Sequence, residues 1–166
     1  MYTSVAEFVE DWGREGANSL KVLRALTDVS LPQRSDPAAN TLGTIAWHMV
    51  LMVGALGSAD GLEVTAPQRG TEQPASASLI ADAFETAART MGEHASKKLT
   101  DGQLASEISL WGRTMTIAAA FQSLVRHLIH HRGQMTVLMR EAGLIVPGVY
   151  GPSREETAAI RARQKG

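Results

Sequence analysis

The side chains best suited to chemistry in this chain of 166 residues are histidines, because the chain contains no cysteine. It therefore has no thiolate nucleophile and no disulfide, and a bound metal would need histidine, carboxylate or carbonyl ligands. Three of the five histidines are expected to point inward from helical segments, where the polar nitrogens of a buried ring must find a partner. These three are His48, His127 and His131.

His127 and His131 are four residues apart in a segment with helical periodicity. Side chains at this spacing share one face of a helix, with Cβ atoms roughly 5–6 Å apart, so both rings could bind one ion. The same spacing also occurs where two histidines only form hydrogen bonds in a core or at a surface. No Glu or Asp lies between the two, in contrast to zinc proteases, so peptidase chemistry is disfavoured.

His48 is the only ionisable side chain in residues 41–59. Taken alone, it fits a neutral core histidine that donates a hydrogen bond to a backbone carbonyl. If its helix lies beside the helix of His127 and His131, the three rings form a three-nitrogen site with positions left for water or substrate. The three histidines together therefore favour a metal site over three separate core residues.

Helical periodicity marks the segments that must position these rings. It predicts an all-α chain with one domain over residues 1–166, an antiparallel four-helix bundle followed by a short C-terminal helix. Capping boxes at Ser4 and Ser153, Asn40 as an N-cap and Gly143 as a C-cap set several of the helix ends. The expected helices begin after Ser4 and end before Pro32, then cover residues 41–59, 78–99 and 116–142, and open again at Ser153.

Two connections interrupt this helical pattern. Residues 58–76 have no periodicity and form a long connection between the second and third helices, which is either functional or a plain surface loop. Residues 107–116 alternate apolar and polar side chains around Gly112, which predicts a short extended or hairpin-like link before the fourth helix.

Charge and hydropathy argue against several classes of protein. The formal net charge is -1 and no block of Lys or Arg occurs, so nucleic-acid binding is not expected. The acidic N-terminus lacks the pattern of a secretory signal, which favours a cytoplasmic protein. Residues 41–59 carry no charged side chain, but Gly43, Gly54 and Gly57 interrupt them, so we interpret the segment as a buried helix and not as a membrane span.

Several motifs resemble those of the DinB family, and the resemblance covers nearly the whole chain. They are Ala46-Trp47-His48, the run from His127 to Met135 with the sequence HLIHHRGQM, Arg140-Glu141-Ala142-Gly143, and the segment from Val146 to Gly151. The resemblance implies a four-helix bundle, commonly dimeric, with a divalent metal, usually nickel or zinc, bound by three histidines. Carried over to this chain, those ligands are His48, His127 and His131. Members with an assigned activity include transferases and isomerases that depend on a low-molecular-weight thiol such as bacillithiol, mycothiol or glutathione.

For other residues near the histidines, the sequence allows two interpretations each. Gln134 could hydrogen-bond a ligand imidazole or a substrate, or satisfy backbone groups. His130 projects about 100° away from His131 and is either a surface residue or a neighbour of the ligands. Trp47 belongs to the core or to a pocket wall. Arg132 is expected to be a solvated or dimer-interface charge, with binding of a substrate anion as the alternative. Candidate general bases come from loops: Asp60, Glu63 and Glu107.

The resulting functional hypothesis is a metal-dependent enzyme acting on a small molecule. The ion would activate a water, as in a hydrolase, or an external low-molecular-weight thiol, as in an S-transferase. The first alternative is a non-catalytic, metal-binding stress-response bundle protein. The second is a bundle without metal, in which the three histidines hydrogen-bond one another.

Overall fold

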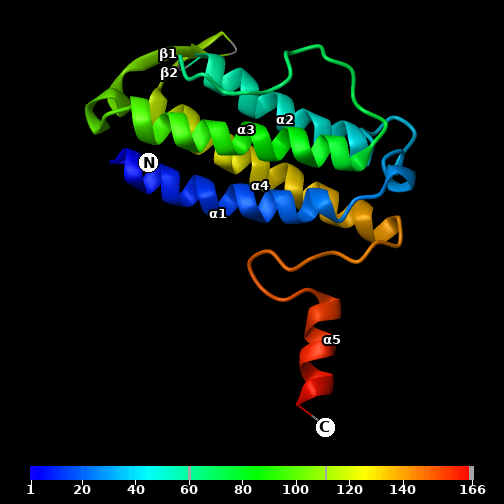
Figure 1. Ribbon diagram of the computed structural model, residues 1–166. Coiled ribbons are helices and arrows are strands. Elements are labelled where there is room, and N and C mark those ends of the chain that lie inside the picture. Colours follow the sequence, from blue (N-terminus) through cyan, green and yellow to red (C-terminus); the bar gives the residue numbers. More distant parts are fainter. Residues whose placement is uncertain (60, 111, 165–166) are drawn as a thin grey trace.

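The computed structural model describes residues 1–59, 61–110 and 112–164, so Asp60 and Trp111 lie outside the described residues. The described chain is mostly helical, with five α-helices, two short 3-10 helices and a two-stranded sheet (Figure 1). The α-helices are α1 (Val5–Arg24), α2 (Leu42–Ala59), α3 (Ala77–Lys98), α4 (Ile117–Glu141) and α5 (Arg154–Arg163). The 3-10 helices are η1 (Asp28–Ser30) and η2 (Asp101–Ala105), and the strands are β1 (Glu107–Leu110) and β2 (Arg113–Thr116).

Local sequence signals fix most helix ends. The capping boxes predicted at Ser4 and Ser153 are both present and open α1 and α5. At the end of α4, Gly143 has φ of 74°, and the amide of Leu144 donates to the carbonyl of Met139 at 2.9 Å. This left-handed glycine and back-bonding amide form a Schellman motif, which confirms the predicted C-cap.

The N-cap predicted for α2 is one residue too early. The amide of Thr44 donates to the Thr41 hydroxyl at 3.1 Å, so Thr41 caps the helix that begins at Leu42, and Asn40 does not. By length and composition α2 could cross a membrane, with a hydropathy of 1.5 over its 18 residues, but 56% of that window is buried inside the protein. It packs against α3 and α4, as a core helix does.

The directions of the long helices differ from the prediction. Helices α1 and α2 each pack against both α3 and α4. The sequence predicts an antiparallel bundle but leaves its topology open, because the connection after the second helix is long enough to cross the bundle end. In the structure α2 and α3 run in the same direction, and so do α1 and α4 (Figure 1). The cause is the long connection after α2, which returns along the helix and lets α3 begin at the end where α2 begins.

That connection is seated on a glycine face of α2. A Cβ atom at Gly54 would lie 2.7 Å from the Cβ of Ala66, and one at Gly57 would lie 2.2 Å from Val64 Cγ2. Both distances are too short for a side chain, so only glycine lets residues 64–66 approach the helix this closely. The glycines that argued against a membrane span therefore serve as the contact surface for the connection.

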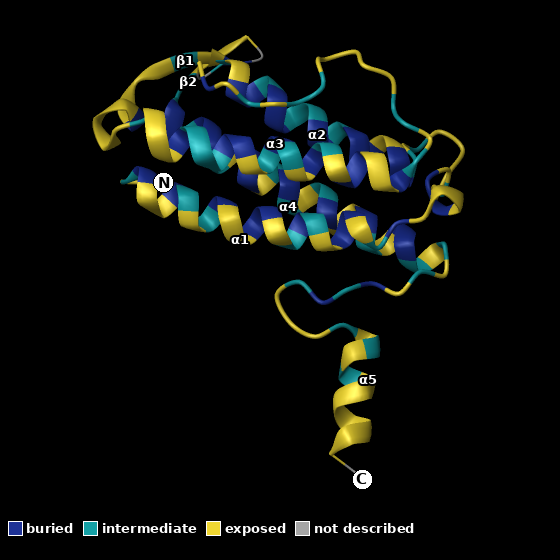
Figure 2. Cartoon of the chain, viewed as in Figure 1, coloured by how far each residue is buried: buried dark blue, intermediate teal, exposed yellow. Residues whose placement is uncertain are grey.

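The two-stranded sheet lies at one end of the long helices, and α5 lies apart from them (Figure 1). Strands β1 and β2 pair antiparallel, with Ile108 opposite Met115, which confirms the predicted hairpin-like link. The hydroxyl of Thr116, the last residue of β2, caps α4 directly. Helix α5 projects away from the other helices and buries none of its residues (Figures 1 and 2).

Candidate metal centre

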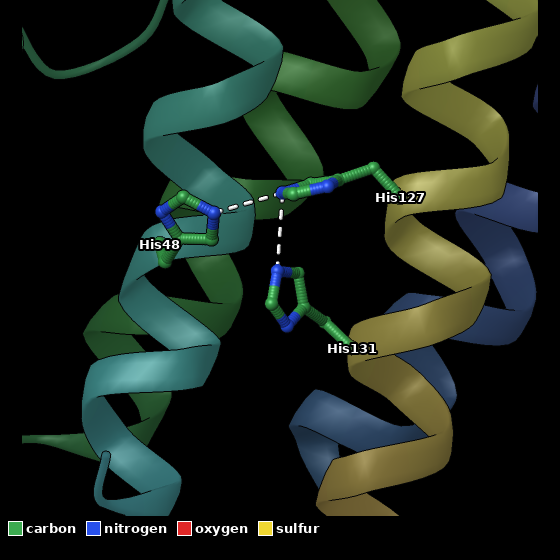
Figure 3. A group of neighbouring side chains, drawn as sticks. All are labelled: His48, His127 and His131. Atoms are coloured by element: carbon green, nitrogen blue, oxygen red, sulfur yellow. Dashed lines mark hydrogen bonds between the residues drawn. The ribbon is translucent and has the colours of Figure 1, made fainter. Parts of the chain in front are cut away.

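Helices α2 and α4 bring three imidazole rings together (Figure 3). Nε2 of His127 lies 2.8 Å from Nε2 of His48 and 3.0 Å from Nε2 of His131. One turn of α4 separates His127 from His131, and α2 supplies His48 from the opposite side. The structure therefore joins the three residues singled out by sequence spacing into one cluster whose donor atoms lie within 4.8 Å of one another.

Gln134 fixes the protonation of one ring. Its Oε1 lies 2.7 Å from Nδ1 of His131, so that nitrogen donates its proton to the amide oxygen. The other nitrogen of His131, Nε2, then carries a lone pair directed at the cluster. The predicted hydrogen bond between Gln134 and one of the three imidazoles is thus present, and it leaves the second nitrogen of His131 able to accept a cation.

Protons alone satisfy this arrangement poorly. Each Nε2 has a single in-plane position, holding either a proton or a lone pair. Nε2 of His127 can therefore form a good hydrogen bond with only one of the two neighbouring Nε2 atoms, that of His48 or that of His131. The other close N···N contact is left without a hydrogen bond. A cation that accepts a lone pair from each ring satisfies all three nitrogens at once.

Burial keeps the three rings neutral. Desolvation, together with the neighbouring rings, lowers the pKa of His127 to about 4. Desolvation also lowers the pKa of His48 and of His131, the latter against the opposing effect of the Gln134 hydrogen bond. At neutral pH all three imidazoles are therefore uncharged, each with one nitrogen lone pair free, which is the form that binds metal.

The donor set fits a divalent ion. Four-coordinate zinc with Zn–N distances near 2.0–2.1 Å places two ligand nitrogens about 3.3 Å apart, so the separations of His127 Nε2 from His48 Nε2 and from His131 Nε2, 2.8 and 3.0 Å, would each widen by a few tenths of an ångström. Three neutral nitrogens leave both positive charges of the ion uncompensated and leave at least one position for a further ligand. Open three-histidine sites of this kind are catalytic more often than structural.

Two pockets border the cluster. One, of about 370 Å³, is lined by His48, Leu51, Met52, Ala55, Arg69 and His127. The other, of about 350 Å³, reaches His131 and Gln134 from the side of residues 35–45. A small molecule in either pocket would meet the ring of at least one of the three histidines.

Some predicted residues lie elsewhere. His130 is exposed, and its ring meets that of His131 edge-on with centroids 5.1 Å apart. Trp47 is buried and donates its indole N–H to the Thr71 carbonyl at 2.9 Å, so it holds the connection. Glu63 pairs with Lys98 at 3.0 Å and Glu107 is exposed in β1, so neither reaches the cluster, whose described members are histidines alone.

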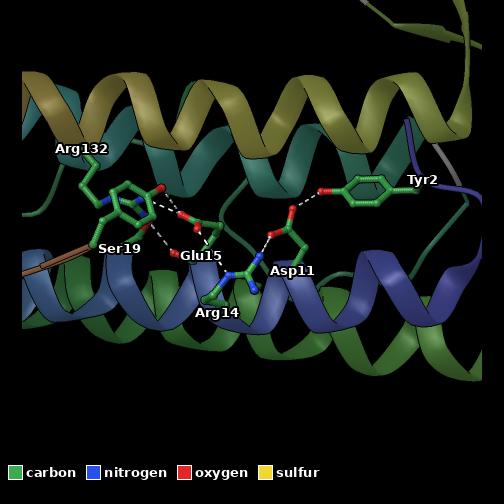
Figure 4. A network of polar contacts seen from close by, with 7 residues as sticks. Tyr2, Asp11, Arg14, Glu15, Ser19 and Arg132 are labelled. Carbon is green, nitrogen blue, oxygen red and sulfur yellow. Dashed lines mark hydrogen bonds and ion pairs between the residues drawn. The ribbon is translucent and has the colours of Figure 1, made fainter.

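The expectation for Arg132 is wrong. Its side chain is 3% exposed, and its guanidinium pairs with the Glu15 carboxylate at 2.5 Å and donates to the Ser19 hydroxyl at 3.0 Å (Figure 4). Tyr150 donates to the same carboxylate at 2.7 Å. Arg132 is therefore a buried structural charge that ties α4 to α1. Its neighbour His131 projects about 100° away around the helix, toward the cluster.

Arg69 is a pocket residue that the sequence reasoning missed. It lies on the connection and lines the pocket beside His48 and His127. The sequence holds a signal for its turn, because Gly70 follows it and adopts φ of 92°. Nothing local indicates that this turn faces the histidines, since that depends on how the connection folds back on α2.

Comparisons with known proteins give the family. The model of the DinB family matches residues 1–165. The chain belongs to the DinB family. It is 40% identical over 158 residues to the uncharacterized protein YrdA of Bacillus subtilis, covering 95% of both chains.

Solved structures of DinB-like proteins share this fold. A DinB-like protein from Bacillus cereus matches with a TM-score of 0.85 and 39% identity, covering 90% of this chain and 100% of the other. A second DinB-like protein, YjoA from Bacillus subtilis, matches with a TM-score of 0.68 and 19% identity over 89% and 99% of the two chains. The second match shows the fold alone, while the first also carries sequence similarity.

Proposed function

We propose that this DinB-family protein is a metal-dependent enzyme that holds nickel or zinc on His48, His127 and His131 within a four-helix bundle. The observation that carries the proposal is the convergence of three Nε2 atoms, because those of His48 and His131 both lie within hydrogen-bonding distance of Nε2 of His127. Two pockets beside these nitrogens give a small-molecule substrate access to them.

In the proposed mechanism the ion activates the nucleophile, and the protein side chains hold the ion and line the pocket. A bound divalent ion would lower the pKa of a water or of an incoming thiol toward neutrality. His127 and His131 hold their lone pairs on the same face of α4, and Gln134 keeps His131 in the required tautomer. Leu51 and Met52 provide an apolar wall to the pocket beside His48.

The proposed reaction is an S-transfer with a low-molecular-weight thiol, or a hydrolysis. The chain has no cysteine, so a thiol nucleophile would have to come from outside. By resemblance to the family, we further propose a homodimer that works in the cytoplasm without nucleic acid or membrane as a partner.

A non-catalytic metal protein of the stress response is the second candidate. It would use the ion to join α2 and α4, a role that the position of the cluster between these helices favours. The bordering pockets favour the enzyme, because a purely structural ion is normally enclosed by four protein ligands.

The decisive experiment measures metal in the purified, untagged protein by inductively coupled plasma mass spectrometry. We expect near-stoichiometric nickel or zinc, reduced at least tenfold in His48→Ala and His127→Ala and unchanged in the matched control His130→Ala. Metal-free protein, even after incubation with both ions, would overturn the proposal. Circular dichroism of the metal-free protein separates the two candidates, because a fold retained without metal favours the enzyme, whereas loss of helical structure on metal removal favours a structural ion.

A further inference from the structure

We propose that the pocket between α2, α4 and the connection binds an organic carboxylate with an apolar body, and that Arg69 receives the carboxylate group. This inference rests on the proposed function and adds the chemical class of the substrate. It is carried by the position of Arg69 in the lining of a pocket that is also lined by two of the three clustered histidines.

Arg69 is held at the pocket by an anchored turn. The amide of Thr71 donates to the Gln68 carbonyl at 3.0 Å, and Gly70 has φ of 92°, which places Arg69 at the first corner of a type II turn. The Thr71 hydroxyl donates to the same carbonyl at 2.7 Å. Trp47 then fastens the turn to α2 through its hydrogen bond to the Thr71 carbonyl. The residue that precedes His48 thus positions the turn that carries Arg69.

The wall between the guanidinium and the imidazoles is apolar. Leu51, Met52 and Ala55 follow His48 at three, four and seven residues, so they form one face of α2. A ligand in this pocket meets hydrocarbon along its body and polar groups only at His48, His127 and Arg69. That pattern suits a small amphiphile better than a sugar or a nucleotide.

Among the described residues that line the pocket, the charged side chain is that of Arg69, which is positive. The described residues that line it include no Asp or Glu, and Arg69 takes part in none of the ion pairs found in the described chain. A divalent ion on three neutral imidazoles would add two uncompensated positive charges next to it. An anionic ligand neutralises both centres, and the planar guanidinium pairs with a carboxylate through two parallel hydrogen bonds.

The test compares hexanoate with hexan-1-ol, which has the same chain without the charge. Binding is followed by amide chemical shifts in zinc-loaded and in EDTA-treated protein, so that the perturbed residues also locate the ligand. We expect hexanoate to bind about tenfold more tightly than hexan-1-ol, and Arg69→Gln to remove this preference. Arg161→Gln, an exposed charge on α5, is the matched control and should change nothing. Ala55→Trp should block both ligands by filling the pocket.

The outcomes distinguish this inference from the proposed function. Equal binding of the two ligands, or a hexanoate preference that survives Arg69→Gln, overturns the carboxylate site even where zinc binds normally. An Arg69-dependent preference in a protein that binds no metal supports the carboxylate site and overturns the metal-dependent enzyme. Arg69 is exposed on the connection, so its substitution should leave folding intact, which circular dichroism checks.

Discussion

Arg132 and Glu15 form an ion pair inside the protein although they are 117 residues apart in the chain. Their side chains are 3% and 5% exposed, and the Glu15 backbone carbonyl accepts a further hydrogen bond from the guanidinium. The pair lies on the face of α4 turned toward α1, whereas His131 lies on the face turned toward α2 (Figures 3 and 4). The orientation of α4 that this pair sets is the orientation that presents His127 and His131 to His48.

Removing one partner of this pair should be costly. Arg132→Met leaves the Glu15 carboxylate buried without its cation, and we expect the free energy of unfolding to fall by about 3–5 kcal/mol in urea titrations. Arg24→Met, which removes exposed ion pairs with Asp82 and Glu85, is the control and should cost at most about 1 kcal/mol. A loss for Arg132→Met as small as that of the control would contradict a structural role for the buried pair.

How far the sequence predicts this protein depends on the range of the interactions involved. Helix ends and the hairpin follow from signals within a few residues, such as the Ser4 capping box and Gly143, and they are confirmed. The histidine cluster was accessible because His127 and His131 share a helix face and His48 stands alone in an apolar segment. The sequence alone does not show that α2 packs against α4, and the structure supplies this contact.

The features that escaped prediction depend on partners far away in the sequence. From its own helix, Arg132 is predicted to be a surface charge, because nothing within that helix indicates burial. Its burial follows from the ion pair with Glu15, which is distant in the sequence. The common direction of α2 and α3 depends on where the connection docks, and Gly54 and Gly57 acquire their role only with Ala66 and Val64 against them. Such contacts are set by tertiary packing and leave no periodic signal.

Substituting a glycine of α2 should release the connection. In Gly57→Ala the new methyl group would meet Val64, and the resulting overpacking should lower stability by about 1–3 kcal/mol and speed proteolysis within residues 61–76. Gly13→Ala is the control, because open space surrounds that position in α1 and alanine favours the helix by about 1 kcal/mol. Limited proteolysis and thermal unfolding measure both effects, and a stabilised Gly57→Ala would refute the close contact.

Gln134 should tune metal affinity without affecting folding. Gln134→Ala removes the acceptor that holds the Nδ1 proton of His131, so we expect metal affinity to fall by about 10–100-fold. The side chain is exposed, and the melting temperature of the metal-free protein should stay unchanged. Competition with a chromogenic chelator measures the affinity, with Ser123→Ala on the same helix as the control. An unaltered affinity would mean that the amide does not orient the ligand.

Acid should destabilise the metal-free protein through the buried histidines. His127 has a pKa of about 4 in the folded chain against an ordinary value of 6.5, so the unfolded chain takes up its proton first as the pH falls. Stability therefore decreases as the pH drops from about 6.5 toward 4, and the lowered pKa values of His48 and His131 act in the same direction. Urea unfolding of EDTA-treated protein at pH 7 and pH 5 measures this loss. His127→Gln should lose less stability over the same interval, because glutamine does not titrate, and an equal loss in both proteins would show that the His127 ring is not desolvated.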